Sequence, residues 1–264
     1  MLKALNTAAT GMQAQQTQLD VIANNMANVN TTGFKKSRAE FEDLLYQTLK
    51  EPGAQQSNNT VHPAGVQVGL GVKTAATQKI FEEGSAHITR NVLDLAIEGS
   101  GFFPIQMPDG QVGYTRDGTF HKDPGGKIVD KNGNALLPEI VIPATTIQAG
   151  ISISDQGQVY IPAANNTGQP QQIGQIQIVN FVNPTGLKSV GKNLFVPTAA
   201  SGAPLQGNPG ENNLGMIAQG QLEGSNVNVV DEMVNMISTQ RSYESNSKVV
   251  QAADQMLQYS NNLR

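Results

Sequence analysis

The sequence contains no cysteine and no tryptophan, and only 14% of its 264 residues are charged. Without cysteine, the chain has no disulfide framework, no thiolate metal site and no cysteine nucleophile. Because the net charge is −4, the dense basic patch of a nucleic-acid-binding protein is not expected. No apolar run approaches the ~18 residues of a membrane-spanning helix, and the N-terminus lacks the apolar core of a cleaved signal peptide. The sequence therefore predicts no membrane span and no cleaved leader.

Side-chain amides and glycine take the place of the missing charge. The chain has 26 Gln, 24 Asn and 27 Gly. Amides can hydrogen-bond to another copy of the chain without the cost of desolvating a charge. This composition is compatible with self-association.

The N-terminal segment has the heptad spacing of a coiled-coil helix. We predict a helix over residues 3–29 that ends near Asn30–Gly33, where Gly33 supplies the break. The apolar positions of its two seams include Leu5, Met12, Leu19, Ile22 and Met26.

The C-terminal segment repeats this spacing, and we predict a helix over residues 228–261. Ser225 or Asn228 is the expected cap. The seam residues are Val229, Met236, Tyr243, Val250 and Leu257. Packing the first helix on the last would leave apolar surface for other chains, whereas an ordinary monomer with a helical hairpin is the alternative.

The middle of the chain reads as β structure. In residues 85–224, short apolar runs alternate with turn sequences such as Asn132-Gly133, a pattern that favours a sandwich or an irregular barrel. One such run, residues 173–179, alternates as a single strand. Residues 51–60 look like a loop, and residues 66–69 and 72–74 alternate as short strands. The predicted fold class is α+β, with long terminal helices in a coiled-coil-like pair and a central all-β domain inserted between them.

The sequence offers little catalytic chemistry. The three histidines lie in different segments without metal-ligand spacing, and most aspartates flank Gly or Asn in turns. Ser245 and Lys248 match S-x-x-K, but both belong to the polar side of the predicted helix. We therefore expect no catalytic residue, no metal, no cofactor and no enzyme.

Three segments carry a family resemblance. Residues 20–35 contain the pattern Ala-Asn-Asn-x-Ala-Asn-x-x-Thr-x-Gly-Phe-Lys, which includes Asn24, Asn25, Asn28, Gly33 and Phe34. The others are residues 96–103 with 114–120, and residues 225–248. Together they resemble the signatures of bacterial flagellar rod and hook proteins over nearly the whole chain. Residues 46–63, with Tyr46, Pro52, Gly53 and Pro63, resemble a stretch typical of the distal rod member and absent from the ordinary hook protein.

The resemblance implies a structural subunit of the distal rod, which polymerises helically into the stiff shaft that carries motor torque to the hook. Implied partners are further copies of the chain, the proximal rod proteins, the hook protein, the surrounding basal-body rings and the flagellar type III export apparatus. The implied location is the basal body outside the cytoplasm, reached without a cleaved signal.

The implied domain plan has three parts. Residues 1–45 and 225–264 would form a helical inner tube, residues 46–84 an extended locking segment, and residues 85–224 a β-rich outer domain. A proximal rod or hook-type protein is the alternative within the family. Outside it, the alternatives are a fibre with a β domain on a helical stalk and a polysaccharide-active enzyme.

Overall fold

The computed structural model describes residues 2–51, 55–57, 60–61, 64–143, 146, 150–162 and 170–262. The chain forms two compact units. The helical unit contains Met1–Ala27, Ser37–Lys79 and Asn228–Arg264, and the β unit contains Asn28–Lys36 and Ile80–Val227. These boundaries differ from the expected ones, since residues 46–79 group with the helices and residues 28–36 with the β structure.

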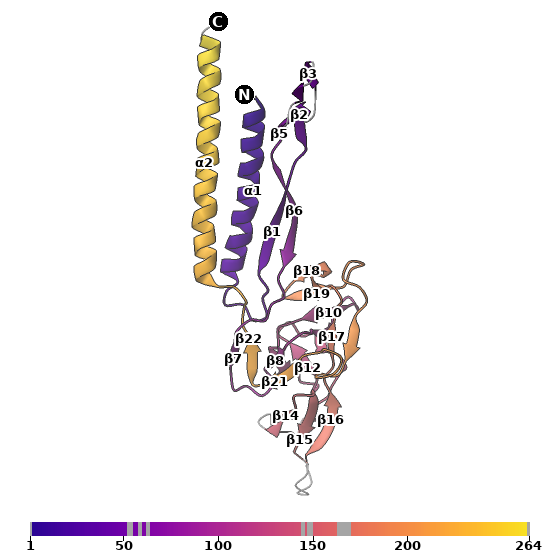
Figure 1. Cartoon of the computed structure of the whole chain (residues 1–264). Helices are drawn as coiled ribbons and strands as arrows, with labels where there is room; N and C mark the ends of the chain where they lie inside the picture. Colours follow the sequence, from indigo (N-terminus) through magenta and orange to yellow (C-terminus); the bar gives the residue numbers. More distant parts are fainter. Residues whose placement is uncertain are drawn as a thin grey trace. The chain divides into compact units, whose positions relative to one another are not determined.

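The helical unit is built on two antiparallel helices, α1 (Leu2–Ala27) and α2 (Val229–Asn262), which lie side by side (Figure 1). Their extents confirm the two predicted helices to within about two residues, as is usual for helix ends. Asn228 is the cap of α2, because its Oδ1 accepts a hydrogen bond of 3.0 Å from the Val230 N–H. Ser225 instead accepts from the Val227 N–H, ahead of the helix. No helix among the described residues combines the length and hydropathy needed to cross a membrane.

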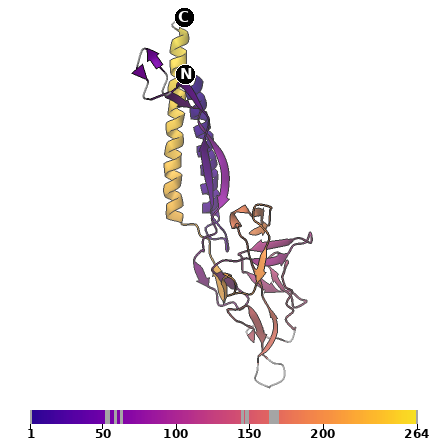
Figure 2. The same ribbon diagram turned by 45° about the vertical axis from the view of Figure 1, so that its right-hand side comes forward.

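A long β ribbon completes the helical unit and lies beside α1 (Figures 1 and 2). Strand β1 (Ser37–Asp43) pairs with β6 (Val72–Lys79), with a bulge between Glu40 and Phe41. Farther along, β2 (Tyr46–Lys50) pairs with β5 (Val66–Gly69), and β3 (Gln55–Ser57) with β4 (Thr60–Val61). The expectation of a loop over residues 51–60 is therefore wrong at β3 and β4, because polar side chains do not prevent backbone pairing.

The β unit is antiparallel throughout its paired strands. Its largest sheet has seven strands in the order β11-β12-β13-β9-β10-β19-β18, and a second sheet has the order β14-β15-β16. Three further pairs are β17-β20, β21-β8 and β22-β7. The bounds are β7 (Ala86–Ile88), β8 (Leu95–Glu98), β9 (Phe103–Gln106), β10 (Val112–Thr115), β11 (Phe120–Lys122), β12 (Ile128–Asp130), β13 (Ala135–Leu136), β14 (Ser152–Ile153), β15 (Gln158–Ile161), β16 (Gln171–Gln175), β17 (Ile178–Asn180), β18 (Lys188–Gly191), β19 (Leu194–Val196), β20 (Leu205–Gly207), β21 (Met216–Gln219) and β22 (Gln221–Glu223), with a 3-10 turn at Pro184–Gly186.

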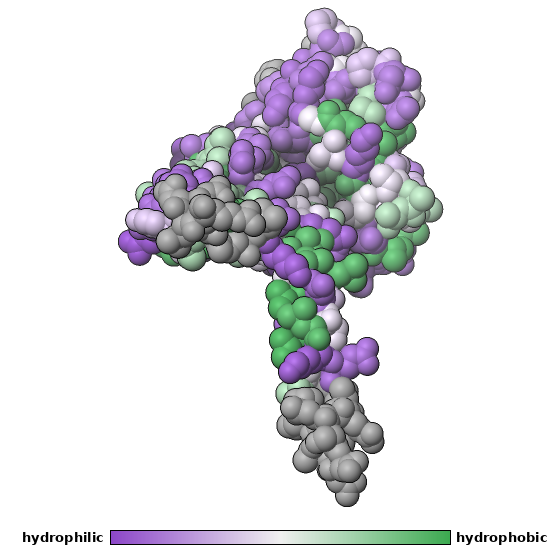
Figure 3. Space-filling view, turned by 90° about the horizontal axis from the view of Figure 1, so that it is seen from above, coloured by the Kyte–Doolittle hydropathy of each residue, from purple (hydrophilic) through white to green (hydrophobic). Residues whose placement is uncertain are grey.

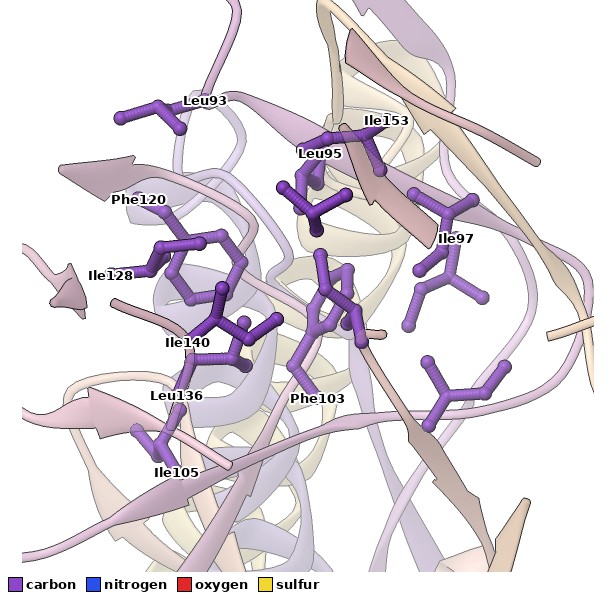
Figure 4. Packing of buried hydrophobic residues seen from close by; sticks show 14 of the residues in the cluster. Leu93, Leu95, Ile97, Phe103, Ile105, Phe120, Ile128, Leu136, Ile140 and Ile153 are labelled. Atoms are coloured by element: carbon purple, nitrogen blue, oxygen red, sulfur yellow. The ribbon is translucent and has the colours of Figure 1, made fainter. Parts of the chain in front are cut away.

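Two hydrophobic clusters stabilise the β unit. The larger gathers side chains such as Leu95, Phe103 and Phe120, and the rings of Phe103 and Phe120 meet edge to face at 5.2 Å (Figure 4). The smaller cluster contains Phe102, Tyr114, Val179, Phe181, Leu187 and Phe195. Because neighbouring side chains along an extended chain point to opposite sides, Phe102 and Phe103 fall in different clusters.

Several local predictions can be compared with this structure. A positive φ angle at Gly133 confirms the turn predicted at Asn132-Gly133. The predicted strand over residues 173–179 is extended as expected but is divided in two, because β16 ends at Gln175 and pairs with β15, whereas β17 begins at Ile178 and pairs with β20. The ladder with β15 ends one residue beyond β16, where the Ile176 N–H donates to the Gly157 carbonyl at 2.7 Å.

Candidate functional site

The first candidate site is the outer side of α2, where large apolar side chains remain exposed. Val230, Met233, Val234 and Ile237 share one side of the helix by their spacing and form the surface called here the α2 apolar face. Val230 is 67% exposed and Val234 60%. A shallow groove of about 440 Å³ adjoins this face and is lined by Val234, Ile237, Ser238, Arg241, Ser242 and Ser245.

The side of α2 that is buried within the unit is polar or small. Glu232, Thr239 and Ala253 are its buried residues. Gly11 of α1 lies close to Asn246, since a Cβ at Gly11 would be 3.0 Å from the Asn246 Nδ2. Small and amide residues therefore form part of the contact between the two helices, while α2 also presents large apolar groups to solvent.

Most of the predicted subunit-packing residues are half-buried. Ile22 is buried, whereas Val229 and Tyr243 are 39% and 38% exposed. The half-buried members are Leu5, Met12, Leu19, Met26, Met236, Val250 and Leu257. Neither predicted seam is fully covered within the chain, so both retain apolar surface for a further contact.

Asn25 fixes the ribbon to α1. Its side chain is only 1% exposed, its Oδ1 accepts from the Ser37 N–H at 2.8 Å, and its Nδ2 donates to the Ser37 carbonyl at 2.9 Å. The amide thus pairs with β1 as a neighbouring strand would. Asn24 lies exposed on α1, and the Asn28 Oδ1 accepts from the Thr31 hydroxyl at 3.1 Å.

Gly33 and Phe34 are buried in the β unit. Gly33 has φ +67°, and its N–H donates to the Glu223 carbonyl at 2.8 Å. A Cβ at Gly33 would lie 2.7 Å from the Asp117 backbone nitrogen, so this close approach requires glycine. Gly33, near the end of the N-terminal signature, is thereby packed against Asp117 of the central motif.

The most buried charges of the β unit lie beside Gly33. The Lys35 Nζ is 2.5 Å from the Glu223 Oε1, and the Arg116 Nη1 is 3.3 Å from the Glu223 Oε2. Lys35 also donates to the Glu82 carbonyl at 2.5 Å, and Arg116 donates to the Gly99 carbonyl at 2.6 Å. We call Lys35, Arg116 and Glu223 the ion triad.

Burial dominates the electrostatics of the ion triad. Desolvation lowers the pKa of Lys35 and of Arg116, and the attraction of Glu223 opposes this effect in both. The Arg116 guanidinium carbon lies 5.4 Å from the centre of the Phe102 ring, and the Arg116 Nε is buried without a hydrogen-bond partner. Lys35 and Arg116 belong to the sequence motifs described above. Glu223 was not predicted, since a single glutamate in a short strand gives no sequence signal.

The second exposed apolar surface belongs to the β2–β5 part of the ribbon. Leu45 is 83% exposed, and Tyr46, Leu49, Val66 and Val68 are also exposed. Figure 3 shows hydrophobic surface gathered on the narrow arm at the bottom of the view. A hydrogen bond to the Asp43 carboxylate raises the pKa of Tyr46. Of the predicted rod-specific residues, Pro52, Gly53 and Pro63 lie outside the described residues.

Comparisons with known proteins agree with the three segments that carry the family resemblance in the sequence. Residues 5–35 match the family "Flagella basal body rod protein", residues 96–161 the "Flagellar hook protein FlgE/F/G D1 domain", and residues 218–263 the "Flagellar basal body rod FlgEFG protein C-terminal". The chain is 50% identical over 264 residues to the flagellar basal-body rod protein FlgG of Borreliella burgdorferi, covering 100% of this chain and 99% of that protein. It is 48% identical over 264 residues to FlgG of Caulobacter vibrioides, covering 100% of both.

A more distant relative is the flagellar hook-basal body complex protein FlhP of Bacillus subtilis, 31% identical over 276 residues and covering 100% of both. The chain belongs to the flagellar basal-body rod protein family. The similarity to FlgG over the whole chain confirms the prediction of a structural protein of the distal rod and not of an enzyme.

Proposed function

We propose that the chain polymerises helically through its terminal helices and forms the stiff shaft between the flagellar motor and the hook. The α2 apolar face carries this proposal. A helix that presents a stripe of large apolar side chains to solvent is suited to packing against another molecule.

The size of the α2 apolar face favours a lattice over an isolated dimer. Burying the exposed parts of its four side chains contributes roughly 1 kcal/mol each, or about 4 kcal/mol together. Association costs about 4–15 kcal/mol, so one such contact alone does not hold a stable dimer. A helical array repeats the contact several times for each subunit, and head-to-tail contacts build such an open array when their rotation does not close.

The helices would pack as coiled-coil-like seams between copies, with Leu5, Met12 and Leu19 facing the α2 residues of neighbours. Residues 1–45 and 225–264 would line an inner tube and residues 85–224 would form an outer layer. Residues 46–84 would lock neighbouring copies together, which the exposed apolar side chains of β2 and β5 support.

The proposed partners follow from this position in the flagellum. They are further copies of the chain, the proximal rod proteins and the hook protein along the axis, the basal-body rings around it, and the type III export apparatus. We place the subunit outside the cytoplasm, exported without a cleaved signal. A proximal rod or hook-type role is the alternative.

A pair of α2 variants tests polymerisation. Val234→Asp puts a charge into the α2 apolar face, and Asn235→Asp puts the same charge at an exposed position on another side of α2. Pelleting and negative-stain microscopy should show polymers for the parent chain and Asn235→Asp, but not for Val234→Asp, with equal helicity of all three. Normal polymers from Val234→Asp would contradict the proposed contact.

Deletion of residues 46–63 tests the locking role and the alternative. The shortened chain should still polymerise but give measurably more flexible filaments, because the lock between copies is lost. Filaments of unchanged stiffness would remove this role from residues 46–63.

A further inference from the structure

The ion triad joins three distant parts of the chain at one carboxylate. Glu223 lies 188 residues after Lys35 and 107 residues after Arg116. Its carboxylate also accepts a hydrogen bond of 3.0 Å from the Gly84 N–H, and its backbone carbonyl accepts from Gly33. The residue that balances the buried cations is thus the last of the three to be synthesised.

Around the Glu223 carboxylate, buried positive charges outnumber buried negative charges. Lys35, Arg116 and Glu223 are all buried, so two cations share one buried anion. Glu83 attracts both cations but is itself exposed to solvent. The Asp117 carboxylate is engaged by Lys131 at 2.5 Å. Closing the β unit around Lys35 and Arg116 without Glu223 would bury two charges with little compensation, which is strongly unfavourable.

We propose that Glu223 is a charge latch that permits the β unit to close only after its last strand, β22, has docked. A chain that emerges N-terminus first from the ribosome keeps the β unit open until residue 223 is available. A chain that is exported N-terminus first, as proposed above, also keeps its β unit open at the export channel until residue 223 has passed. This role at the channel rests on the proposed function. The latch keeps an incomplete β unit from becoming a stable, bulky body before the chain has passed.

Four full-length proteins test the latch: the parent chain, Glu223→Gln, Lys35→Met and the double variant. Glutamine keeps the size of the side chain and an acceptor for Gly84 but removes the charge. Hydrogen exchange at the Phe102 and Val179 amides, which are bonded to each other's carbonyls at 2.8 and 2.9 Å, reports opening of the β unit.

We expect Glu223→Gln to accelerate exchange at these amides by about 100-fold or more, because two cations lose their counter-charge. The same change in the Lys35→Met background strands only one cation, so its effect should be at least ~10-fold smaller. An equal effect in both backgrounds would overturn the latch, since hydrogen-bond geometry alone would explain it. If Glu223→Gln does not fold, recovery of folding in the double variant supports the latch and its failure to fold overturns it.

Glu42→Gln is the matched control, because Glu42 pairs at 2.5 Å with Lys73 and both are exposed. It should leave exchange at Phe102 unchanged. Pulse-labelled refolding of the parent chain tests the order of events. Protection at Phe102 should appear together with protection at Gly33, which donates to Glu223, and earlier protection at Phe102 would overturn the latch. These measurements need no polymer, so failure of the latch and failure of the proposed function are seen separately.

Discussion

Replacing Asn25 should weaken the helical unit, and when the replacement is aspartate the loss of stability should depend on pH. The Asn25 amide is buried and makes two hydrogen bonds, of 2.8 and 2.9 Å, to the Ser37 backbone. Asn25→Ala leaves one donor and one acceptor unpaired at about 1–3 kcal/mol each, so we expect a loss of about 2–6 kcal/mol. Asn25→Asp keeps the acceptor but places a buried carboxylate oxygen against the Ser37 carbonyl, which should cost about 3 kcal/mol or more at neutral pH.

The aspartate variant has a distinctive pH signature. A protonated carboxyl can donate to the Ser37 carbonyl as the amide does, so the folded state raises the pKa of this aspartate above its ordinary value of about 3.9. Relative to the parent chain, the stability of Asn25→Asp should therefore be highest at and below about pH 4 and fall as the pH rises towards 7.

Urea unfolding followed by circular dichroism at several pH values measures this difference. Asn6→Asp is the matched control, since Asn6 is exposed on the same helix and should change stability by less than about 1 kcal/mol. A loss for Asn25→Asp that is the same at pH 4 and pH 7, or no larger than that of Asn6→Asp, would refute the assigned role of the amide.

Three further predictions concern single positions. Gly33→Ala should destabilise the β unit by more than ~2 kcal/mol in urea unfolding, because its Cβ meets the Asp117 backbone at 2.7 Å, whereas Gly110→Ala, with φ +82° and open space, should cost only about 1–2 kcal/mol. Burial lowers the pKa of Lys35 in the folded chain below its ordinary value of 10.5. Between the lowered pKa and 10.5, the unfolded chain therefore binds the proton more tightly than the folded chain does. The stability of the parent chain relative to Lys35→Met should therefore rise with pH across that window in urea titrations, and a flat difference would contradict the burial effect. Asn228→Ala should reduce the melting stability of the helical unit by about 1 kcal/mol through loss of the α2 cap, while Ser225→Ala leaves the helix start unchanged.

The terminal helices could be predicted closely because their signal is local. Seven-residue spacing and a capping Asn228 depend on neighbours along the chain, and α2 begins one residue after that cap. The sequence could not predict in the same way which side of α2 faces solvent. Periodicity shows that a stripe exists, but only the tertiary packing shows that Val230 and Val234 are exposed while Glu232 and Thr239 are buried.

The β structure was predictable as a class but not in its pairing. Positive φ at Gly133 follows from a short-range turn signal. The division into β16 and β17 depends on partners far along the chain, because β16 pairs with β15 and β17 pairs with β20. The ion triad was beyond sequence reasoning for the same reason, because Glu223 meets Lys35 only after 188 residues of intervening chain have folded.

The central claim is that the terminal helices hold the polymer together. A cryo-EM reconstruction of filaments assembled from the purified chain tests it most directly. We predict an open helical tube in which α1 and α2 line the inner wall, with Val230, Val234 and Ile237 buried against neighbouring copies. A closed oligomer, or a filament in which these side chains remain exposed to solvent, would contradict the account.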